Sequence, residues 1–334
     1  MKIIIPMAGL GKRMRPHTLT TPKPLLPVAG KPIVQRLVED IAAICQEKIE
    51  EIAFIIGDFG KETEERLLDI AKKEGVKGKI YYQTEPLGTG HAVLCAKDSL
   101  DGKTVVAFAD TLFRADFRLD ENKDGIIWVN KVDDPSAFGV VKTNENNIVT
   151  DFIEKPKTDV GTNLAIIGIY YFKNGKQLKS ELQYLIDNDV CKEGEYQLTD
   201  ALQNMMKKGT TFQTDVVTEW LDCGNKDATV FTNQRVLEIN KAQSMISSSV
   251  KNINSNIIEP CFIGENVVIE NSKIGPHVSI GDNTQIKDSV ITNSIIQNNC
   301  NLSNVTFDNS MIGNHVACNG KLNDVSIGDY TVLK

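Results

Sequence analysis

The sequence predicts two kinds of structure in one chain: an α/β domain with a mostly parallel, Rossmann-like sheet, and then a parallel β-helix. Three observations support this prediction. Apolar runs alternate with amphipathic segments up to residue 241, residues 242–256 are polar, and the rest of the chain repeats an aliphatic residue every five or six positions. We therefore predict a first domain at 1–241, a linker at 242–256 and a β-helix at 257–334.

Six apolar runs are the expected strands of the first domain. They are mostly continuous, which is typical of strands buried on both faces of a parallel sheet. A helix after Gly30 is expected to place Ile33, Leu37, Ile41 and Ile44 on one face. Such alternation of strands and helices predicts ligand binding at the carboxyl ends of the strands. The expected strands are Lys2–Pro6, Glu51–Ile56, Lys79–Gln83, Thr104–Ala109, Gly125–Val132 and Leu164–Phe172, with a further helix over Glu62–Lys73.

The repeat in the C-terminal part predicts the coils of a β-helix. Apolar residues recur from Ile263 to Cys318 at spacings of five or six, and Ile-Gly opens several units. In such a fold the aliphatic residue of each unit points inward, whereas Asn, Asp and Gly form the corners. About eleven to thirteen units would make roughly four coils. A disordered Asn-rich tail is the alternative, but disordered segments lack regular aliphatic residues.

Composition excludes several classes of protein. The formal net charge is −7, which argues against a nucleic-acid partner. No apolar run approaches the roughly 20 residues of a membrane span, and Ile3–Ile5 is too short for a signal peptide. The seven cysteines are scattered singly without a CxxC pair, which argues against structural zinc and fits a reducing cytoplasm.

The first strand leads into a turn that is suited to binding phosphates. Ala8, Gly9 and Gly11 supply backbone N–H groups, and Arg13 and Lys23 supply fixed cations soon after. The prolines on either side of the lysine stiffen its backbone, which argues against an ordinary solvated charge. This loop is the candidate site for a nucleoside triphosphate, with both cations as candidate catalytic residues.

Two aspartates follow apolar runs. Asp110 ends the run at Ala109, and Asp222 stands before a glycine in the segment WLDCG. An acid at such a position is often a helix cap or a turn former. Carboxylate oxygens are also the ligands that Mg²⁺ prefers, so the pair is a candidate site for one Mg²⁺ that bridges phosphates.

A glycine-rich segment after the third strand is the candidate base-reading element. The Gln83 amide offers both a donor and an acceptor to the edge of a pyrimidine, and Gly88 allows close approach to a flat ring. Pro86 and Thr89 complete this candidate set, whereas His91 is expected to be structural. An ordinary glycine-rich loop is the alternative interpretation.

A carboxylate and an amine stand side by side in the segment FIEKP. Adjacent residues of a strand point to opposite faces, so Glu154 and Lys155 act on one ligand only if the strand ends here, as Pro156 indicates. Glu154 is then suited to sugar hydroxyls and Lys155 to a sugar phosphate. An exposed ion pair is the alternative.

These motifs together resemble the sugar-1-phosphate nucleotidylyltransferases. The resemblance implies that Gly139, Glu154 and the backbone near Ile166 contact the sugar, and that Lys155 binds its phosphate. It implies that Asp110 and Asp222 hold Mg²⁺, and that the C-terminal β-helix is left-handed. The motifs, in chain order, are AGLGKRMRP, PKPLLP, QTEPLGTGHAV, ADT, FGVV, FIEKP, GEYQLTD and WLDCG.

The resemblance implies transfer of a nucleotidyl group from an NTP to a sugar-1-phosphate, with release of pyrophosphate. The Gln83 and Gly88-Thr89 pattern favours dTTP or UTP, and glucose-1-phosphate is the default sugar. Mannose-1-phosphate guanylyl transfer is the alternative within the family. Ala8 and Lys12 depart from the family's usual glycine and threonine, and Lys12 adds a charge beside the phosphates.

Two rival hypotheses come from other classes. Hexapeptide β-helices are common in acyltransferases, for which His277 and His315 are the candidate catalytic residues, although both follow Ile-Gly corners and are expected to face outward. A non-catalytic homologue that binds sugar nucleotide would have lost its metal or phosphate ligands, and here they are intact. The β-helix is expected to serve homo-oligomer assembly and stability.

Overall fold

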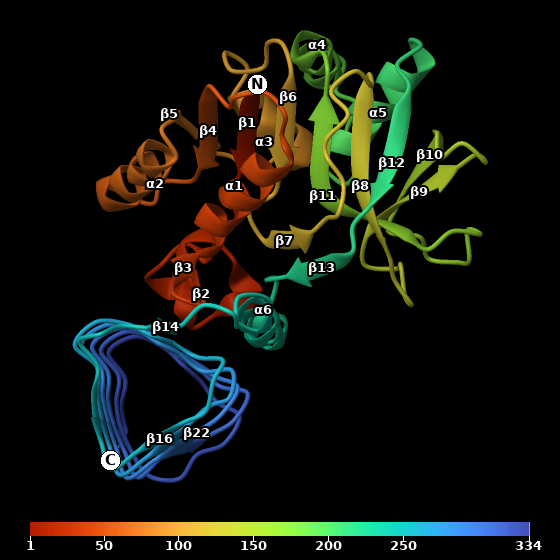
Figure 1. Cartoon of the computed structure of the whole chain (residues 1–334). Coiled ribbons are helices and arrows are strands. Elements are labelled where there is room, and N and C mark those ends of the chain that lie inside the picture. Colours follow the sequence, from red (N-terminus) through yellow and green to blue (C-terminus); the bar gives the residue numbers. More distant parts are fainter. Residues whose placement is uncertain (334) are drawn as a thin grey trace. The chain divides into compact units, whose positions relative to one another are not determined.

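The computed structural model describes residues 1–333, which form two compact units (Figure 1). The first unit comprises Met1–Gly9 and Leu37–Trp220. The second comprises Leu10–Arg36 and the chain from Leu221 onward. The segment that carries Arg13 and Lys23 therefore belongs to the same unit as the C-terminal strands. The end of the first domain predicted at residue 241 stays a prediction.

A nine-stranded sheet forms the centre of the first unit. Its main path runs β10-β9-β11-β6-β1-β4-β5, and β8 pairs with both β11 and β12. The strands are β1 (Lys2–Pro6), β4 (Glu51–Ile56), β5 (Lys77–Tyr82), β6 (Thr104–Ala107), β8 (Gly125–Lys131), β9 (Gly139–Thr143), β10 (Val149–Glu154), β11 (Leu164–Phe172) and β12 (Phe212–Val216), and β7 (Thr111–Arg114) lies outside this sheet.

The parallel part of the sheet explains the positions of three candidate segments. Strands β6, β1, β4 and β5 are parallel neighbours, and the side chains of Ile3–Ile5 are completely buried between the layers. Parallel strands end at the same edge. The segments that contain Ala8, Gln83 and Asp110 follow β1, β5 and β6, so all three leave the sheet at this edge. The α/β fold class is confirmed, with β9, β10 and β11 as antiparallel additions.

Helices cover the sheet because each has one apolar side. In α2 the buried residues are Thr63, Leu67, Ile70 and Ala71, one turn apart, while the charged positions face solvent. The helix expected after Gly30 is α1, whose residues Ile33, Leu37 and Ile41 are buried. The helices are α1 (Ile33–Ile44), α2 (Lys61–Lys73), α3 (Thr89–Cys95), α4 (Gly175–Asp187), α5 (Leu198–Lys207) and α6 (Lys226–Ile239); α6 and the start of α1, up to Arg36, belong to the second unit.

The second unit contains a parallel β-helix whose coils appear as stacked triangular turns in Figure 1. Its faces are two sheets of six strands and one of four, and every strand pair is parallel, consistent with a left-handed β-helix. Inward aliphatic residues form one continuous core. The strands are β14 (Met245–Ile246), β15 (Lys251–Ile253), β16 (Asn256–Ile257), β17 (Phe262–Ile263), β18 (Val268–Glu270), β19 (Lys273–Ile274), β20 (Ser279–Ile280), β21 (Gln285–Lys287), β22 (Val290–Ile291), β23 (Ile295–Ile296), β24 (Asn301–Ser303), β25 (Thr306–Phe307), β26 (Met311–Ile312), β27 (Ala317–Asn319), β28 (Ser326–Ile327) and β29 (Val332–Leu333).

The first coil begins earlier than expected. Strands β14 and β15 lie within the polar segment 242–256, and they pair with β17 and β18. The segment is polar because the outward positions of a coil carry Ser and Asn, and Asn254 occupies a corner with a φ of 50°. For the same reason the estimate of roughly four coils was too low, since two faces have six strands each.

The remaining elements of the second unit are short. Segment 10–36 has three single-turn 3₁₀ helices, η1 (Lys12–Met14), η2 (His17–Leu19) and η3 (Lys23–Leu25), and a hairpin of β2 (Pro27–Val28) and β3 (Lys31–Pro32). Strand β13 (Glu219–Asp222) contains the second of the two points at which the chain passes from the first unit to the second.

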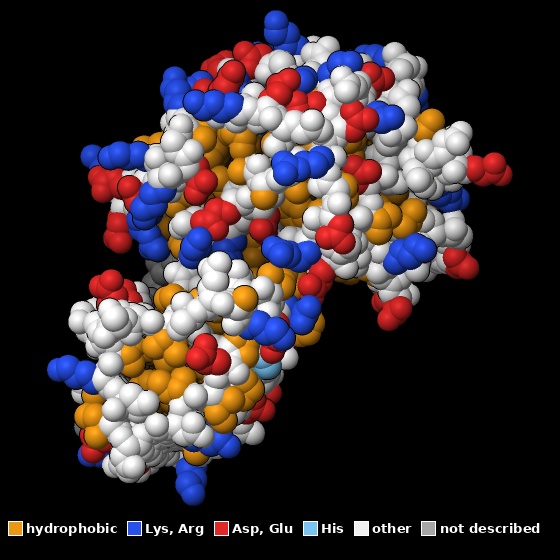
Figure 2. Space-filling model, in the orientation of Figure 1, with side chains coloured by type: hydrophobic (Ala, Val, Ile, Leu, Met, Phe, Trp, Pro, Cys, Tyr) orange, Lys and Arg blue, Asp and Glu red, His pale blue; other side chains and the backbone are white. Residues whose placement is uncertain are grey.

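The charge distribution on the surface and the lengths of the helices can be compared with the expectation that neither nucleic acid nor a membrane is a partner. On the face drawn in Figure 2, Lys and Arg side chains are interspersed with Asp and Glu rather than gathered in one basic patch. This agrees with the net charge of −7. Within residues 1–333, no helix has the length and apolar character needed to cross a bilayer.

Candidate functional site

The candidate base-reading segment is held against the chain that precedes α5. The N–H of Tyr196 donates to the Leu87 carbonyl at 2.8 Å, and the N–H of Gly90 donates to the Tyr196 carbonyl at 2.8 Å. The Thr89 hydroxyl accepts from the N–H of Leu198 at 3.0 Å. At Gly88, with a φ of 100°, a Cβ atom would lie 2.7 Å from the Tyr196 carbonyl oxygen. Only glycine fits this close approach.

The Gln83 amide has a fixed orientation. Its Nε2 lies 3.2 Å from the Gly88 carbonyl oxygen and 3.2 Å from His91 Nδ1. A carbonyl oxygen only accepts, so the nitrogen of the amide faces it, and His91 Nδ1 must also accept. Both amide protons are thereby used. Among residues 1–333 the Oε1 atom has no donor, so the acceptor is the one group of this amide that is not used within the described chain.

A pocket of about 170 Å³ lies beside this segment. It brings together three predicted sugar-binding residues, Gly139, Glu154 and Ile166, although they come from three different strands. Thr89 also lines the pocket, and its hydroxyl lies 3.2 Å from Gln197 Oε1. The base-reading segment and the pocket therefore share a residue. The other lining residues are Phe108, Gly168, Tyr170, Gln197, Leu198 and Thr199.

Glu154 and Lys155 are separated by the end of a strand, as the sequence indicated. Strand β10 ends at Glu154, and Lys155 follows with a φ of 41°. The Glu154 side chain is 31% exposed, and loss of solvent raises the pKa of its carboxyl, with Lys155 opposing the shift. Lys155 lies outside the pocket lining, is 66% exposed, and has its Nζ 3.8 Å from Glu154 Oε1. The lysine is thus placed at the margin of the pocket rather than in it.

The second unit holds the other predicted cations and one of the aspartates. Arg13 lies in η1, and Lys23 opens η3. Asp222 accepts from the N–H of Gly224 through Oδ1 at 3.0 Å. A Cβ atom on Gly224 would lie 3.3 Å from Arg13 Nη2, so the guanidinium packs close to this turn. Arg13 and Asp222 therefore converge within this unit.

The donor chemistry of the two aspartates fits Mg²⁺. Both aspartates are half-buried. Asp110 follows strand β6, and Asp222 is the last residue of strand β13. Mg²⁺ is commonly bound by one or two carboxylates together with substrate phosphates and water. Within residues 1–333 there is no cluster of three or more His, Cys, Asp or Glu side chains suited to a metal.

Several lining residues of the pocket had no role in the sequence analysis. Gln197 and Thr199 stand in the motif GEYQLTD, which was noted without a function. Phe108 and Tyr170 belong to apolar runs that read as core. The motif was the only signal in the sequence for Gln197 and Thr199, and there was no signal for Phe108 and Tyr170. The rings of this aromatic pair pack edge to face with centroids 6.5 Å apart.

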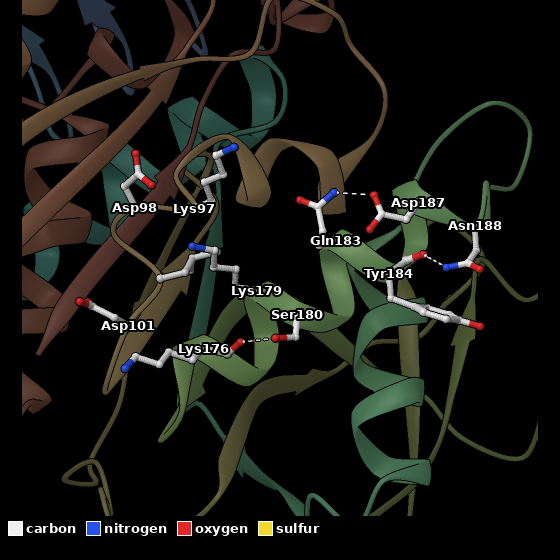
Figure 3. A pocket seen from close by; sticks show the side chains of 11 residues that line it. Lys97, Asp98, Asp101, Lys176, Lys179, Ser180, Gln183, Tyr184, Asp187 and Asn188 are labelled. Carbon is white, nitrogen blue, oxygen red and sulfur yellow. Dashed lines mark hydrogen bonds between the residues drawn. The ribbon is translucent and has the colours of Figure 1, made fainter.

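A second hollow, of about 770 Å³, lies along α4 (Figure 3). Its side chains carry both charges, and several polar groups bond within the wall, as Gln183 does with Asp187 at 2.8 Å. Asp101 forms an ion pair with Lys2.

Both histidines that the acyltransferase hypothesis requires make structural contacts. His277 Nε2 lies 2.6 Å from Glu238 Oε1 of α6. The His315 ring stacks on Tyr330 with centroids 4.7 Å apart. Each has a positive φ at its corner, 64° and 56°. Neither histidine lines any of the pockets described above.

Comparisons with known proteins agree with this geometry. The family described as "Nucleotidyl transferase" matches residues 2–264. A "Bifunctional protein GlmU" of Methanococcus maripaludis is 32% identical over 276 residues, which cover 82% of this chain but only 61% of the relative. A glucose-1-phosphate thymidylyltransferase of Streptomyces antibioticus is 30% identical, with 95% and 93% covered. The structure of a UDP-glucose pyrophosphorylase with UDP-glucose has a TM-score of 0.58 at 23% identity over 71% of this chain and 98% of that one, which shows the shared fold.

Proposed function

Because the chain belongs to the nucleotidyl transferase family, we propose that it transfers a nucleotidyl group from an NTP to a sugar-1-phosphate. The observation that carries the proposal is the position of Thr89. This residue belongs to the base-reading segment and also lines the pocket that contains Glu154. A base and a sugar held at these two places would be joined through their phosphates.

The acceptor of Gln83 supports uracil or thymine as the base. Both bases carry an N–H at N3, which donates to an acceptor such as Oε1. Cytosine and adenine have an acceptor at the corresponding position, so each would repel Oε1. Guanine also carries an N–H there, and its discrimination rests on other contacts. dTTP or UTP is therefore the favoured donor substrate, and guanylyl transfer is the alternative.

The pocket supports a hexose phosphate as the acceptor substrate. Glu154, Gln197 and Thr199 offer hydrogen-bonding groups to sugar hydroxyls, while Phe108, Ile166 and Tyr170 are apolar. Mixed walls of this kind suit the edges and faces of a sugar ring. Lys155, at the margin of the pocket, is placed for the sugar phosphate. Glucose-1-phosphate is the favoured sugar.

The reaction requires no protein nucleophile. A phosphate oxygen of the sugar-1-phosphate attacks the α-phosphorus of the NTP, the bond between the α-phosphorus and the bridging oxygen breaks, and pyrophosphate leaves. The attacking oxygen is already an anion, so no general base is needed. Arg13 and Lys23 would neutralise the triphosphate, which reduces the repulsion between two anions.

Asp110 and Asp222 are the residues that would hold Mg²⁺. When bound, the ion would neutralise phosphate charge in the transition state. The carboxylates would in turn help to orient the triphosphate, since they would hold the cation beside it. Homo-oligomer formation through the β-helix belongs to this proposal as an expectation.

A pyrophosphate-release screen tests the proposal. Each of dTTP, UTP, GTP, CTP and ATP is paired with glucose-, mannose- and N-acetylglucosamine-1-phosphate. We expect the fastest release with dTTP or UTP and glucose-1-phosphate. Preference for GTP with mannose-1-phosphate would replace the favoured substrates by the guanylyl alternative. No release from any pair would refute nucleotidyl transfer.

A further inference from the structure

One outer face of the β-helix is covered within its own unit. In the sheet β14-β17-β20-β23-β26-β28 the second residue of each strand points into the β-helix core, so the first residue points outward. Yet the outward residues Ser279, Ile295 and Met311 are 4%, 1% and 0% exposed. Another part of the chain must therefore lie on this face.

Segment 10–36 contacts one end of this face. Gly30 packs on the Phe262 ring, because a Cβ atom there would lie 2.2 Å from two ring carbons. The N–H of Ala29 donates to Asn233 Oδ1 at 2.9 Å, and the Ser279 hydroxyl donates to the same oxygen at 2.7 Å. Asn233 of α6 thus links the segment to strand β20.

The same segment contacts the last coil at the other end of the face. The Thr20 hydroxyl donates to Asp329 Oδ2 at 2.7 Å. His17 Nε2 lies 3.1 Å from the Ser326 hydroxyl, and His17 is 1% exposed. A Cβ atom on Gly328 would lie 2.9 Å from Pro16 Cβ, so the two backbones are in close contact.

The carboxylate of Asp329 is itself held in place. Its Oδ1 accepts from the N–H of Asn314 at 2.7 Å, and its Oδ2 accepts from Asn314 Nδ2 at 3.3 Å. The acceptor for Thr20 is therefore fixed by the preceding coil before segment 10–36 contacts it. Charged acceptors make stronger hydrogen bonds than neutral ones.

Segment 10–36 depends on such anchors because its own structure is slight. Up to Pro32 it contains single 3₁₀ turns and two-residue strands, which fix few backbone dihedrals, and only Ile33–Arg36 at its end belong to the longer helix α1. Arg13 precedes the anchors at 16–20, and Lys23 lies between these anchors and those at Ala29 and Gly30. A small displacement of a binding group costs much of its effect.

We propose that the last coil of the β-helix, through Ser326, Gly328 and Asp329, positions the loop that places Arg13 and Lys23 on the triphosphate. The inference rests on the proposed function and assigns the β-helix a part in substrate binding. Thr20, His17 and the three coil residues are positioning residues, since they act through the two cations. Burial lowers the pKa of His17 to about 4, so the ring is neutral in this contact.

The test compares two threonines that make the same bond. Thr20→Val removes the hydroxyl that reaches Asp329, whereas Thr292→Val removes one that donates to Asp308 at 2.9 Å within the β-helix. We measure kcat, the KM of each substrate and the thermal midpoint. We expect Thr20→Val to raise the KM for the NTP roughly tenfold and to leave that for the sugar-1-phosphate within about twofold. Thr292→Val should change neither KM value. Thr20→Ser, which keeps a hydroxyl, should have the wild-type KM for the NTP.

Two glycines at Ile-Gly corners provide a second pair. Gly328→Ala would push against Pro16, whereas Gly281→Ala would push against Asn298 inside the β-helix, at 2.2 Å. We expect faster amide hydrogen exchange in residues 10–36 for Gly328→Ala only. Equal changes in both KM values, or no change with Thr20→Val, would overturn the inference. If the wild type releases no pyrophosphate from any substrate pair, the proposed function fails instead, and exchange in residues 10–36 still tests the anchoring.

Discussion

At the scale of single residues, the orientation of the Gln83 amide determines which hydrogen-bonding group this side chain can offer to a ligand. From the sequence alone, either the nitrogen or the oxygen of this amide could face a ligand, because Gln offers both a donor and an acceptor. The contacts with Gly88 and His91 leave only the acceptor for a ligand. His91 is thus structural, as expected, and its ring nitrogen also sets the polarity of the neighbouring amide.

Replacement of His91 by Phe should weaken base selection. The ring keeps its bulk but no longer accepts from Gln83, so the amide loses one of two bonds that hold it. A hydrogen bond contributes about 1 kcal/mol, so we expect the ratio of kcat/KM for UTP over CTP to fall on the order of fivefold. His91→Asn retains an acceptor and should recover part of the ratio. An unchanged ratio in His91→Phe would show that the amide is oriented by other contacts.

His17 should make folding sensitive to acid. Burial lowers its pKa from 6.5 to about 4, against the charge of Asp329. The unfolded chain therefore binds a proton at a higher pH than the folded chain. Neutral His17 therefore makes its full contribution to the unfolding free energy above pH 6.5, and this contribution is lost as the pH falls through 4. The loss is on the order of 3 kcal/mol.

The measurement is the urea unfolding free energy of wild type and His17→Gln between pH 7.5 and 4. Carboxylates also titrate in this range, so the difference between the two proteins is the informative quantity. We expect the gap between them to narrow by a few kcal/mol as the pH falls. A gap that stays constant with pH would mean that His17 titrates normally in the folded protein.

At the scale of elements, the segment from Gln83 to Ala92 is a pre-formed loop that continues into the first turn of α3. Its main chain makes two hydrogen bonds with the backbone of Tyr196, one through the N–H and one through the carbonyl of that residue. Gly88 allows the two backbones to come this close. In the proposed function, such a segment would bind the base without having to be ordered by it. Its position also explains why Thr89 lines the neighbouring pocket.

Gly88→Ala should disrupt this docking. Its Cβ atom would lie 2.7 and 2.8 Å from the Tyr196 backbone, whereas Gly75 also has a positive φ, 68°, but has open space. We expect Gly75→Ala to cost about 1 kcal/mol of unfolding free energy and Gly88→Ala on the order of 3 kcal/mol. Gly88→Ala should also raise the KM for the NTP. Equal costs in urea unfolding would contradict the role of the close approach.

Local patterns in the sequence predicted most of the elements. Strand β11 and helix α1 follow from apolar runs and from helical spacing. Glu154 and Gly139 were placed through short motifs, and the pocket brings them together. Gln197 and Thr199 were not assigned, because their part in the pocket depends on how α5 packs beside β10.

At the scale of the whole molecule, the longest-range contacts were beyond sequence reasoning. His17 and Ser326 are separated by 309 positions, and nothing local in either segment indicates the other. The first coil was predicted to be a linker because its outward positions are polar. Polar residues at these positions are compatible with a coil as well as with a linker. The division into two units places the segment with Arg13 and Lys23 in the same unit as the β-helix. That grouping led to the proposed role of the last coil.

The proposed transfer of a nucleotidyl group places Asp110 among the metal ligands. The most direct test is pyrophosphate release from UTP or dTTP with glucose-1-phosphate and Mg²⁺ by wild type, Asp110→Asn and the control Asp98→Asn. The control changes an aspartate in the hollow along α4. We predict release by wild type and Asp98→Asn, and a loss of about a hundredfold or more in Asp110→Asn with an unchanged circular dichroism spectrum. Near-wild-type release from Asp110→Asn would contradict the account.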